Sequence, residues 1–269
     1  MLIEARNTAI DVPDMGHQVL IGRRRTLRIL KPVSISIAKG ETEGLVGESG
    51  SGKTTLGRTL LRLYEPSEGT LQFDGQDITH ASASELKPLR RRMQMIFQDP
   101  QSSLNPRHTI GGILAGALKL HGLDASERAI AAILDRVGLP STAMKRYPHQ
   151  LSGGQRQRVG IARAIALKPD FVVADEIVSG LDVSTQAQVL DLLRGLKEEM
   201  GMALAFISHD LSVVRHLCER VVIMKSGEIV EEGRTAEVFA KPRTEFTRTL
   251  IDSIPLPEVN PDWLSAPTG

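Results

Sequence analysis

Short apolar runs typical of β-strands alternate along the chain with longer segments in which apolar residues recur at helical spacing. Strands that alternate with helices indicate a parallel sheet with helices packed on its faces, so this pattern predicts an α/β fold. The predicted strands are residues 33–37, 44–46, 95–97, 171–174, 203–207, 221–224 and 228–230, the last two joined by a hairpin turn at Ser226 and Gly227. The predicted helices are residues 56–63, 110–138 with a break at Gly122 and Leu123, 155–167 and 184–199.

These elements divide the chain into a strand-rich core and a helical insert. The predicted strands lie toward both ends, and residues 106–166 between them are mainly helical. We therefore expect one domain over residues 1–255, with a helical subdomain at about 106–166 inserted in its α/β core. Residues 99–107 are rich in Pro, Ser and Asn and are expected to form a loop. Beyond Lys241 proline recurs and periodicity fades, which predicts a C-terminal tail over residues 256–269.

Composition and charge narrow the functional classes. The 269 residues include 33 Lys and Arg against 32 Asp and Glu, a formal net charge of +1, whereas nucleic-acid-binding proteins are usually strongly basic. The single cysteine, Cys218, excludes a disulfide within the chain and a cysteine-ligated metal site.

The longest apolar stretch, residues 110–118, is shorter than the roughly 20 residues of a membrane-spanning helix. The N-terminus carries acids and no apolar core, unlike a secretory signal. Any membrane contact is therefore expected to come through partner proteins.

A glycine-rich segment follows the predicted strand at residues 44–46. It fits the phosphate-loop pattern G-x-x-x-x-G-K-[ST] and precedes a predicted helix, so that backbone N–H groups and the helix N-terminus can bind phosphate oxygens. Lys53 is expected to reach the β- and γ-phosphates of a nucleotide, and the Thr54 hydroxyl to ligate Mg²⁺. A chance glycine-rich turn is the alternative, which the strand–loop–helix context disfavours. The segment comprises Gly47, Glu48, Ser49, Gly50, Ser51, Gly52, Lys53, Thr54 and Thr55.

Two acids, Asp175 and Glu176, follow the apolar strand predicted at residues 171–174. Parallel sheets bind ligands at the carboxyl ends of their strands, so both carboxylates are expected beside the phosphate loop. Asp175 would hold Mg²⁺, directly or through water, and Glu176 would orient or deprotonate an attacking water. Taken alone, the pair is equally well explained as a cap of the following helix.

The pentapeptide Leu151-Ser-Gly-Gly-Gln155 begins the third predicted helix and resembles the signature sequence of ABC ATPases. The Ser152 hydroxyl and the amides of Gly153 and Gly154 would form a second anion-binding helix N-terminus. A plain helix start explains Ser-Gly-Gly by itself. It does not explain the whole pentapeptide in a chain that also carries a phosphate loop, so we identify the chain by resemblance with this family.

The resemblance implies a RecA-like P-loop NTPase core with a small antiparallel β part and a helical subdomain. It implies ATP hydrolysis, with ATP and Mg²⁺ bound where the phosphate loop of one subunit faces the signature segment of a second. Gln98 matches the family's glutamine loop, which ligates Mg²⁺ and senses the membrane partner, and residues 179–182 match the loop that contacts the opposite subunit. His209 matches the switch histidine that contacts the γ-phosphate, although a lone histidine beside a helix cap is more often structural.

The implied site residues fall into three groups. The catalytic pair is Glu176 and His209. The metal ligands are Thr54, Gln98 and Asp175. The nucleotide-binding residues are those of the phosphate loop together with Gln98, Ser152, Gly153, Gly154 and Gln155.

Four further segments resemble the dipeptide, oligopeptide and nickel importer branch of the family: residues 97–107, 146–158, 181–188 and 237–250. This implies an importer ATPase subunit, with di- or oligopeptides as the expected solute. The implied partners are a second ABC ATPase subunit, identical or different, two transmembrane permease subunits and an extracytoplasmic solute-binding protein. The chain would then lie peripherally at the cytoplasmic face of the inner membrane. One ATPase of such pairs usually carries a C-terminal cysteine cluster, and this chain resembles the other.

Other functions remain open at this point. Nickel chelates, opines and short glycans are alternative solutes. A soluble ABC ATPase acting on DNA or ribosomes is an alternative class, although such proteins usually have paired cassettes or a long coiled-coil insert. A non-hydrolysing structural partner is a third, which the intact Lys53, Glu176 and His209 oppose.

Three positions depart from the family pattern. Ile177 stands where proline usually follows the catalytic glutamate, which is expected to loosen the loop while leaving the carboxylate. Glu43 stands at a usually apolar position beside the phosphate loop, which predicts an edge strand or an ionic partner. No Tyr or Phe precedes residue 33, where the adenine-stacking aromatic usually lies. Arg24, Arg25 or Arg28 could stack on the base instead, but a solvated basic loop explains each of them better.

Overall fold

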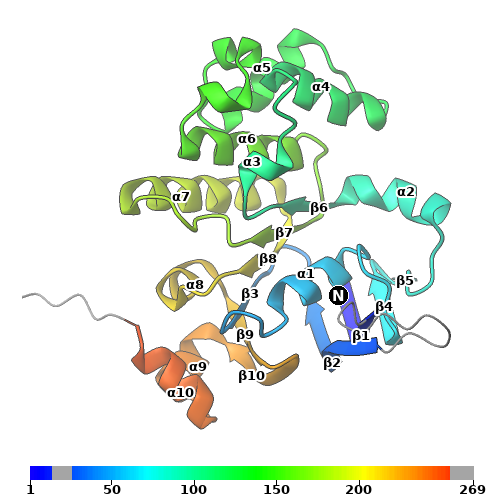
Figure 1. Cartoon of the computed structure of the whole chain (residues 1–269), viewed down its shortest axis with the longest axis vertical. Coiled ribbons are helices and arrows are strands. Elements are labelled where there is room, and N and C mark those ends of the chain that lie inside the picture. The colour runs from blue at the N-terminus through cyan, green and yellow to red at the C-terminus, as the bar shows by residue number, and fades with distance from the viewer. Residues whose placement is uncertain (14–25, 255–269) are drawn as a thin grey trace, which may run out of the picture.

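The computed structural model of the chain describes residues 1–13 and 26–254. These residues form two sheets with helices packed on them (Figure 1). The tail predicted at 256–269 and two of the base-stacking candidates, Arg24 and Arg25, lie outside the described residues. The predicted α/β class is confirmed.

The larger sheet has six strands in the order β10-β9-β3-β8-β7-β6. Strand β10 pairs antiparallel with β9, and the other five strands are parallel, so their carboxyl ends share one edge of the sheet. Strands β7 and β8 are buried along their whole length, as their unbroken apolar sequences predict. The strands are β3 (Thr42–Gly47), β6 (Met93–Ile96), β7 (Phe171–Asp175), β8 (Ala203–Ile207), β9 (Arg220–Lys225) and β10 (Glu228–Arg234).

The smaller sheet is antiparallel, with the order β2-β1-β4-β5. Only the end of its long edge strand was predicted as a strand, at residues 33–37. The first strand of this sheet, residues 3–13, was not predicted. Asn7 has a positive φ of 47°, and the pairing with the neighbouring strand shifts register around it. These irregularities interrupt the alternation of apolar and polar residues that predicts a strand. The strands are β1 (Ile3–Pro13), β2 (Thr26–Ile37), β4 (Glu68–Phe73) and β5 (Gln76–Asp77).

Two hydrophobic cores lie on opposite faces of the six-stranded sheet. Within β3, Leu45 belongs to one core and Val46 to the other, because successive side chains of a strand point to opposite faces. One core lies between the two sheets and includes residues of α1 (Lys53–Leu60) and α2 (Ala83–Arg92). The other core is covered by α4 (Ile110–Leu120), α5 (Glu127–Arg136), α6 (Gly153–Ile165), α7 (Val183–Met200) and α8 (Leu211–Leu217).

Each of the four predicted helical segments contains a helix, but α2, α8 and the two helices after the six-stranded sheet were not predicted. The predicted helix at 110–138 is two helices, and Gly122 with φ 67° lies in the break between them. The predicted loop at 99–107 contains a short helix, α3 (Pro100–Ser103). Two 3₁₀ turns, Ser141–Lys145 and Pro148–Gln150, precede α6. After the six-stranded sheet the chain adds α9 (Thr235–Ala240) and α10 (Glu245–Asp252).

Glu43 lies on β3, which has β9 on one side and β8 on the other. The predicted edge position is therefore wrong, because β3 is an interior strand. The alternative of an ionic partner is right, since Nε of Arg220 lies 3.2 Å from Oε2 of Glu43.

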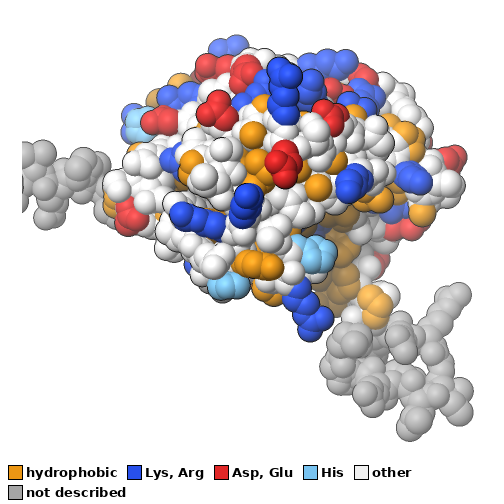
Figure 2. All heavy atoms as spheres, turned by 90° about the horizontal axis from the view of Figure 1, so that it is seen from above, with side chains coloured by type: hydrophobic (Ala, Val, Ile, Leu, Met, Phe, Trp, Pro, Cys, Tyr) orange, Lys and Arg blue, Asp and Glu red, His pale blue; other side chains and the backbone are white. Residues whose placement is uncertain are grey.

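Within the described ranges, no helix combines the length and the apolar character needed to span a bilayer. Figure 2 views the molecule from the end that carries α4 and α5, and Lys, Arg, Asp and Glu side chains are interspersed over that face. This mixture agrees with the near-zero net charge.

Candidate functional site

One edge of the six-stranded sheet brings together side chains from distant parts of the sequence. Gly47 ends β3 and Asp175 ends β7, while Gln98 and His209 each lie two residues beyond the ends of β6 and β8. The shared edge follows from the parallel arrangement of these four strands. It gathers the phosphate loop with Gln98, Asp175, Glu176 and His209, whereas the residues at the start of α6 lie elsewhere.

The loop between β3 and α1 depends on glycine at defined points. Gly47, Gly50 and Gly52 have φ angles of 151°, 77° and 103°, which side-chain-bearing residues rarely adopt. A Cβ on Gly47 would also lie 2.1 Å from the carbonyl oxygen of Met224. Glu48, Ser49 and Gly50 are exposed at the tip of the loop, and Gly52 is the N-cap of α1. The loop therefore presents backbone to solvent at a helix N-terminus, the arrangement that binds phosphate.

Lys53 is enclosed by this loop. Its side chain is nearly fully buried, and its Nζ donates hydrogen bonds to the carbonyl oxygens of Gly47 and Glu48, both at 2.8 Å. Burial lowers the pKa of Lys53, and the nearby Glu176 and Asp175 carboxylates oppose that shift. The two hydrogen bonds hold the Lys53 ammonium group against the backbone of the phosphate loop.

Thr54 and Asp175 form an oxygen pair beside Lys53. The Thr54 hydroxyl donates to Oδ1 of Asp175 at 2.9 Å, and Asp175 is only 3% exposed. Burial raises the pKa of Asp175, and the bond from Thr54 opposes that shift. Neighbouring ligands of an octahedral Mg²⁺ with bonds of 2.0–2.1 Å lie about 2.9 Å apart, so this oxygen pair fits two ligand positions.

The described residues contain no group of three His, Cys, Asp or Glu side chains arranged to hold a metal ion by themselves. A Mg²⁺ at the Thr54–Asp175 pair would therefore take its remaining ligands from water and substrate phosphates, as Mg²⁺ usually does.

Glu176 is contacted by two side chains that arrive from other strands. Nε2 of Gln98 donates to its Oε2 at 3.0 Å, and Nδ1 of His209 lies 3.5 Å from the same oxygen. The Glu176 backbone is anchored by a 3.0 Å hydrogen bond from its N–H to the carbonyl oxygen of Ile207. Its φ of 45° is in the left-handed region, which costs a non-glycine residue about 1–3 kcal/mol. Such strain in a residue between two polar partners is typical of functional sites.

Ser152, Gly153, Gly154 and Gln155 do not join this cluster. Ser152 is the N-cap of α6 and forms a capping box with Gln155, and the side-chain hydrogen bonds of both residues stay within that box in the described structure. Helix α6 packs on the face of the six-stranded sheet opposite to α1 (Figure 1). Within one chain, the start of α6 is therefore a second, separate helix N-terminus.

The sequence analysis missed a support of the phosphate loop. Gly227, at the turn between β9 and β10, donates its N–H to the carbonyl oxygen of Ser51 at 2.9 Å. Its own carbonyl accepts from the N–H of Lys31 at 2.9 Å, and a Cβ on it would lie 2.5 Å from the carbonyl oxygen of Ile29. Ser226-Gly227 signalled a hairpin turn, but sequence spacing carries no information that this turn reaches the loop.

Ile177 and Arg28, both discussed above with the departures from the family pattern, are each held by contacts in the structure. Ile177 is 1% exposed and packs in the core on the face covered by α4 to α8. Nε of Arg28 donates to Oδ1 of Asp11 at 2.8 Å, and its NH1 donates to Glu68 at 3.3 Å. The Arg28 guanidinium is thus held by two carboxylates on the antiparallel sheet.

The family model, the related sequences and the solved structure that match this chain are all described as ABC transporter or ATP-binding proteins. A family model described as ABC transporter matches residues 30–179. A Brucella ovis protein provisionally named a peptide import ATP-binding protein is 53% identical over 240 residues, 88% of this chain and 75% of that protein. A Bacillus subtilis protein provisionally named an oligopeptide transport ATP-binding protein, YkfD, is 45% identical over 253 residues, 93% of this chain and 77% of that protein. A solved structure of the dimeric ATP-binding cassette MJ0796 in a post-hydrolysis state, bound to ADP and Pi, matches with a TM-score of 0.75 and 29% identity, over 87% of this chain and 98% of that one.

Proposed function

The chain belongs to the ABC transporter family, and on that premise we propose that it is the ATP-hydrolysing subunit of an importer whose hydrolytic sites form between two ATPase subunits. The observation that carries the proposal is the cluster at the edge of the six-stranded sheet. There a buried lysine and a Thr54–Asp175 oxygen pair lie beside Glu176, which Gln98 and His209 contact.

The phosphate loop and Lys53 would bind the nucleotide. Backbone N–H groups of residues 47–55 and the N-terminus of α1 supply donors to phosphate oxygens, and the Lys53 ammonium supplies a charge. Thr54, Asp175 and Gln98 would hold Mg²⁺, which when bound neutralises charge on the β- and γ-phosphate oxygens. Thr54 and Asp175 fit this role by their separation, and Gln98 by its position beside Glu176.

Glu176 would orient the attacking water and accept its proton. A carboxylate suits this work when its orientation is fixed, and here two side chains and a backbone hydrogen bond fix it. In this scheme Gln98 and His209 hold the Glu176 carboxylate and also line the position of the γ-phosphate. His209 has 62% of its side-chain surface accessible, so it is free to meet a substrate.

A second ATPase subunit would complete the site. Residues 152–155 offer a helix N-terminus that lies apart from the phosphate loop of its own chain, so only another chain can bring such an end to that loop. The MJ0796 cassette, to which this chain is similar, is dimeric in its solved structure.

Di- or oligopeptides are the solute class we assign to the importer, because the relatives named above are peptide and oligopeptide import proteins. Two transmembrane permeases and an extracytoplasmic solute-binding protein would complete the complex, and the permeases would hold this chain at the cytoplasmic face of the membrane. Nickel chelates, opines and short glycans are the alternative solutes.

ATP hydrolysis measured against protein concentration tests the two-subunit site. If two chains must meet, the rate per chain rises with concentration until the dimer is saturated, and Lys53→Ala removes the activity at every concentration. A rate per chain that stays flat over a wide dilution series, for protein shown to be monomeric throughout, would contradict the composite site. If no phosphate is released at any protein concentration, even with the native partner ATPase present, the non-hydrolysing alternative would be favoured instead.

A further inference from the structure

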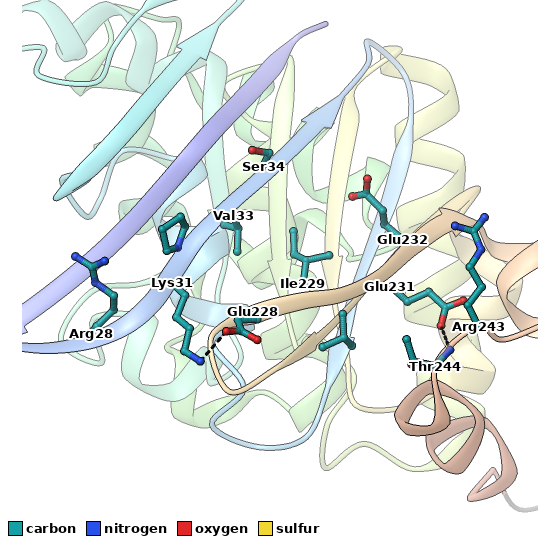
Figure 3. Close-up of a pocket in the computed structure, with 12 residues that line it drawn as sticks. Arg28, Lys31, Val33, Ser34, Glu228, Ile229, Glu231, Glu232, Arg243 and Thr244 are labelled. Atoms are coloured by element: carbon teal, nitrogen blue, oxygen red, sulfur yellow. Dashed lines mark hydrogen bonds and ion pairs between the residues drawn. The ribbon is translucent and has the colours of Figure 1, made fainter.

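A groove of about 900 Å³ lies between the edge strands β2 and β10, and its charged side chains have structural partners (Figure 3). Lys31 of β2 pairs with Glu228 of β10 at 2.7 Å. Glu231 accepts the backbone N–H groups of Arg243 and Thr244 at the start of α10. These contacts join the two sheets and fix α10, so the fold itself explains them.

Arg163 on α6 is different, because it is a partly buried cation without an acidic partner. In the part of the chain that the structure describes, burial lowers the pKa of the Arg163 guanidinium and no carboxylate opposes this shift. An arginine stays protonated in proteins, so a guanidinium that loses water needs other acceptors. The contacts of Arg163 identify those acceptors.

Arg163 contacts the chain on both sides of Gln98. Its guanidinium carbon lies 5.5 Å from the centre of the Phe97 ring, within the range of a cation–π contact. Its NH1 donates to the carbonyl oxygen of Ser103. Phe97 directly precedes Gln98, and Ser103 is the last residue of α3. Helix α6 therefore holds both ends of the short segment, residues 97–103, that carries Gln98.

This Gln98 segment is closed on itself by backbone hydrogen bonds. The N–H of Ser103 donates to the carbonyl oxygen of Asp99 at 3.3 Å, and the N–H of Ser102 donates to Oδ2 of Asp99 at 3.3 Å. Because Asp99 directly follows Gln98, the bond from α6 to Ser103 also restrains the backbone at Gln98. Gln98 in turn donates to Oε2 of Glu176 at 3.0 Å. A continuous chain of contacts thus leads from α6 to the carboxylate proposed to activate water.

We propose that Arg163 is a positioning residue, which fixes Gln98 and through it the Glu176 carboxylate for ATP hydrolysis. The inference rests on the proposed function and extends it to a residue outside the cluster around Glu176. The hydrogen bond and the ring contact of Arg163 go to the Gln98 segment, so its effect on Glu176 is indirect. Residues 152–155 lie on the same helix, so the helix proposed to meet a second subunit also holds Gln98 in place.

Steady-state ATP hydrolysis by the purified full-length chain tests the proposal, with the native partner ATPase present if it is required. Arg163→Met keeps an unbranched side chain and removes the charge and the N–H donors. Its kcat should fall about 10- to 100-fold, because a misplacement of about 1 Å can cost about 10²-fold in rate. The KM for ATP should change less than about threefold, because the phosphate loop is untouched. Arg163→Lys keeps a cation and a donor, so it should recover most of kcat.

Two comparisons separate positioning from a general loss of packing. Arg158 on the same helix donates to the carbonyl oxygen of Val137 at 3.0 Å, at the end of α5. Arg158→Met therefore removes the same kind of bond elsewhere and should leave kcat within about twofold. In a Gln98→Ala chain, Arg163→Met should have almost no further effect on kcat, because residues that act through one another are not additive.

Hydrogen exchange of the nucleotide-free chain reports on the Gln98 segment independently of hydrolysis. The amides of residues 102–104 should exchange at least about tenfold faster in Arg163→Met than in wild type, and at the wild-type rate in Arg158→Met. If Arg163→Met does not fold, Phe97→Leu takes its place, with an expected loss in kcat of about fivefold.

Three results would overturn the proposal. The first is a wild-type kcat for folded Arg163→Met, or for Phe97→Leu where Arg163→Met does not fold. The second is an undiminished effect of Arg163→Met in the Gln98→Ala chain, and the third is unchanged exchange of residues 102–104. A wild-type chain that hydrolyses no ATP would instead contradict the proposed function, and hydrogen exchange would still decide whether Arg163 holds the Gln98 segment.

Discussion

At the scale of single residues, Glu176 combines a strained backbone with two polar contacts. Its left-handed φ is stabilised by the bond from its N–H to Ile207, so the surrounding structure determines where the carboxylate points. Gln98 and His209 reach the same carboxylate oxygen from two other strands. A side chain fixed in this way loses little entropy when it orients a water, which is the role proposed for it.

Replacing Glu176 with Gln keeps its size and removes its charge. We expect ATP binding to persist while turnover falls about 10²–10⁴-fold, or roughly 3–5 kcal/mol of barrier, because the general base is lost. Uncleaved ATP should then keep two chains together, so a closed dimer should accumulate with ATP and Mg²⁺. Steady-state ATPase activity and size analysis measure both effects, with the native partner ATPase present if it is required.

Lys53→Ala is the contrasting variant. It should weaken nucleotide binding and give no ATP-dependent dimer, because the loop loses its ammonium group. Wild-type turnover by Glu176→Gln would show that another group activates the water.

Glu43 should make stability depend on pH. Its pKa is raised from 4.5 to about 8 in the folded chain, so the folded state binds the proton more tightly than the unfolded state does. The stabilisation is complete below about pH 4.5 and is lost as pH rises through about 8. Between pH 6 and pH 8 this single group should lower the free energy of unfolding by about 2 kcal/mol. Denaturant unfolding of wild type and Glu43→Gln at both pH values measures it.

The exposed Glu198 provides a matched control for this measurement. Glu198→Gln should leave the wild-type pH dependence unchanged, while Glu43→Gln should remove the part due to the buried group. A Glu43→Gln variant that loses as much stability as wild type between pH 6 and pH 8 would show that Glu43 does not titrate there.

At the scale of elements, the start of α6 is built for close approach to α7. Ser152 caps the helix, and a Cβ on Gly154 would lie 2.5 Å from Cγ2 of Thr185 on α7. Glycine is required here by space rather than by backbone conformation, since Gly154 has no positive φ. The amides proposed to meet a second subunit thus lie on a helix end that packs closely against α7.

Gly154→Ala should therefore destabilise the fold by about 1–3 kcal/mol through overpacking. Thr185→Ser removes Cγ2 and keeps the hydroxyl that bonds to Asp182, so in combination it should restore most of the loss. Gly160→Ala in the same helix is the control, because no atom lies within 4 Å of its Cβ position. That substitution should stabilise by about 0.5–1 kcal/mol through helix propensity. Equal effects of the two alanines on the unfolding free energy would contradict the packing argument.

At the scale of the whole molecule, two cores flank the six-stranded sheet, and the cluster around Glu176 lies at the edge where the parallel strands have their carboxyl ends. Side chains of α4 to α8 pack in one core, and the phosphate loop leads into α1 in the other.

Loss of this chain from its cell should abolish uptake of a di- or oligopeptide, because the proposed importer would lose the ATP hydrolysis that drives transport. Growth on, or accumulation of, a labelled peptide series measures the effect, and a Lys53→Ala chain should fail to restore it. Unchanged peptide uptake together with lost uptake of an unrelated solute would contradict the peptide assignment while leaving the transporter function in place.

The sequence by itself predicted all six strands of the larger sheet and four helical segments, and it singled out the candidate site residues, whereas β1, β4, β5, α2 and α8 to α10 were not predicted. Unbroken apolar runs predicted β7 and β8 because strands buried on both faces carry no polar positions, and the phosphate loop was evident because only glycine tolerates its backbone angles. For the acids at the end of β7, the rule that ligands bind at the carboxyl ends of strands left a helix cap as an equal alternative, and the resemblance to ABC ATPases decided their predicted role.

Only the tertiary structure decided which of these residues meet. Strand order brings Gln98 and His209 to one oxygen of Glu176, and long-range pairing of this kind leaves no mark in local periodicity. The same is true of Gly227 beneath the phosphate loop and of β1, whose register shifts hide its alternation. Glu43 shows the limit most plainly. Its charge was visible in the sequence as an exception, but its burial on an interior strand and its contact with Arg220 follow from packing between two sheets.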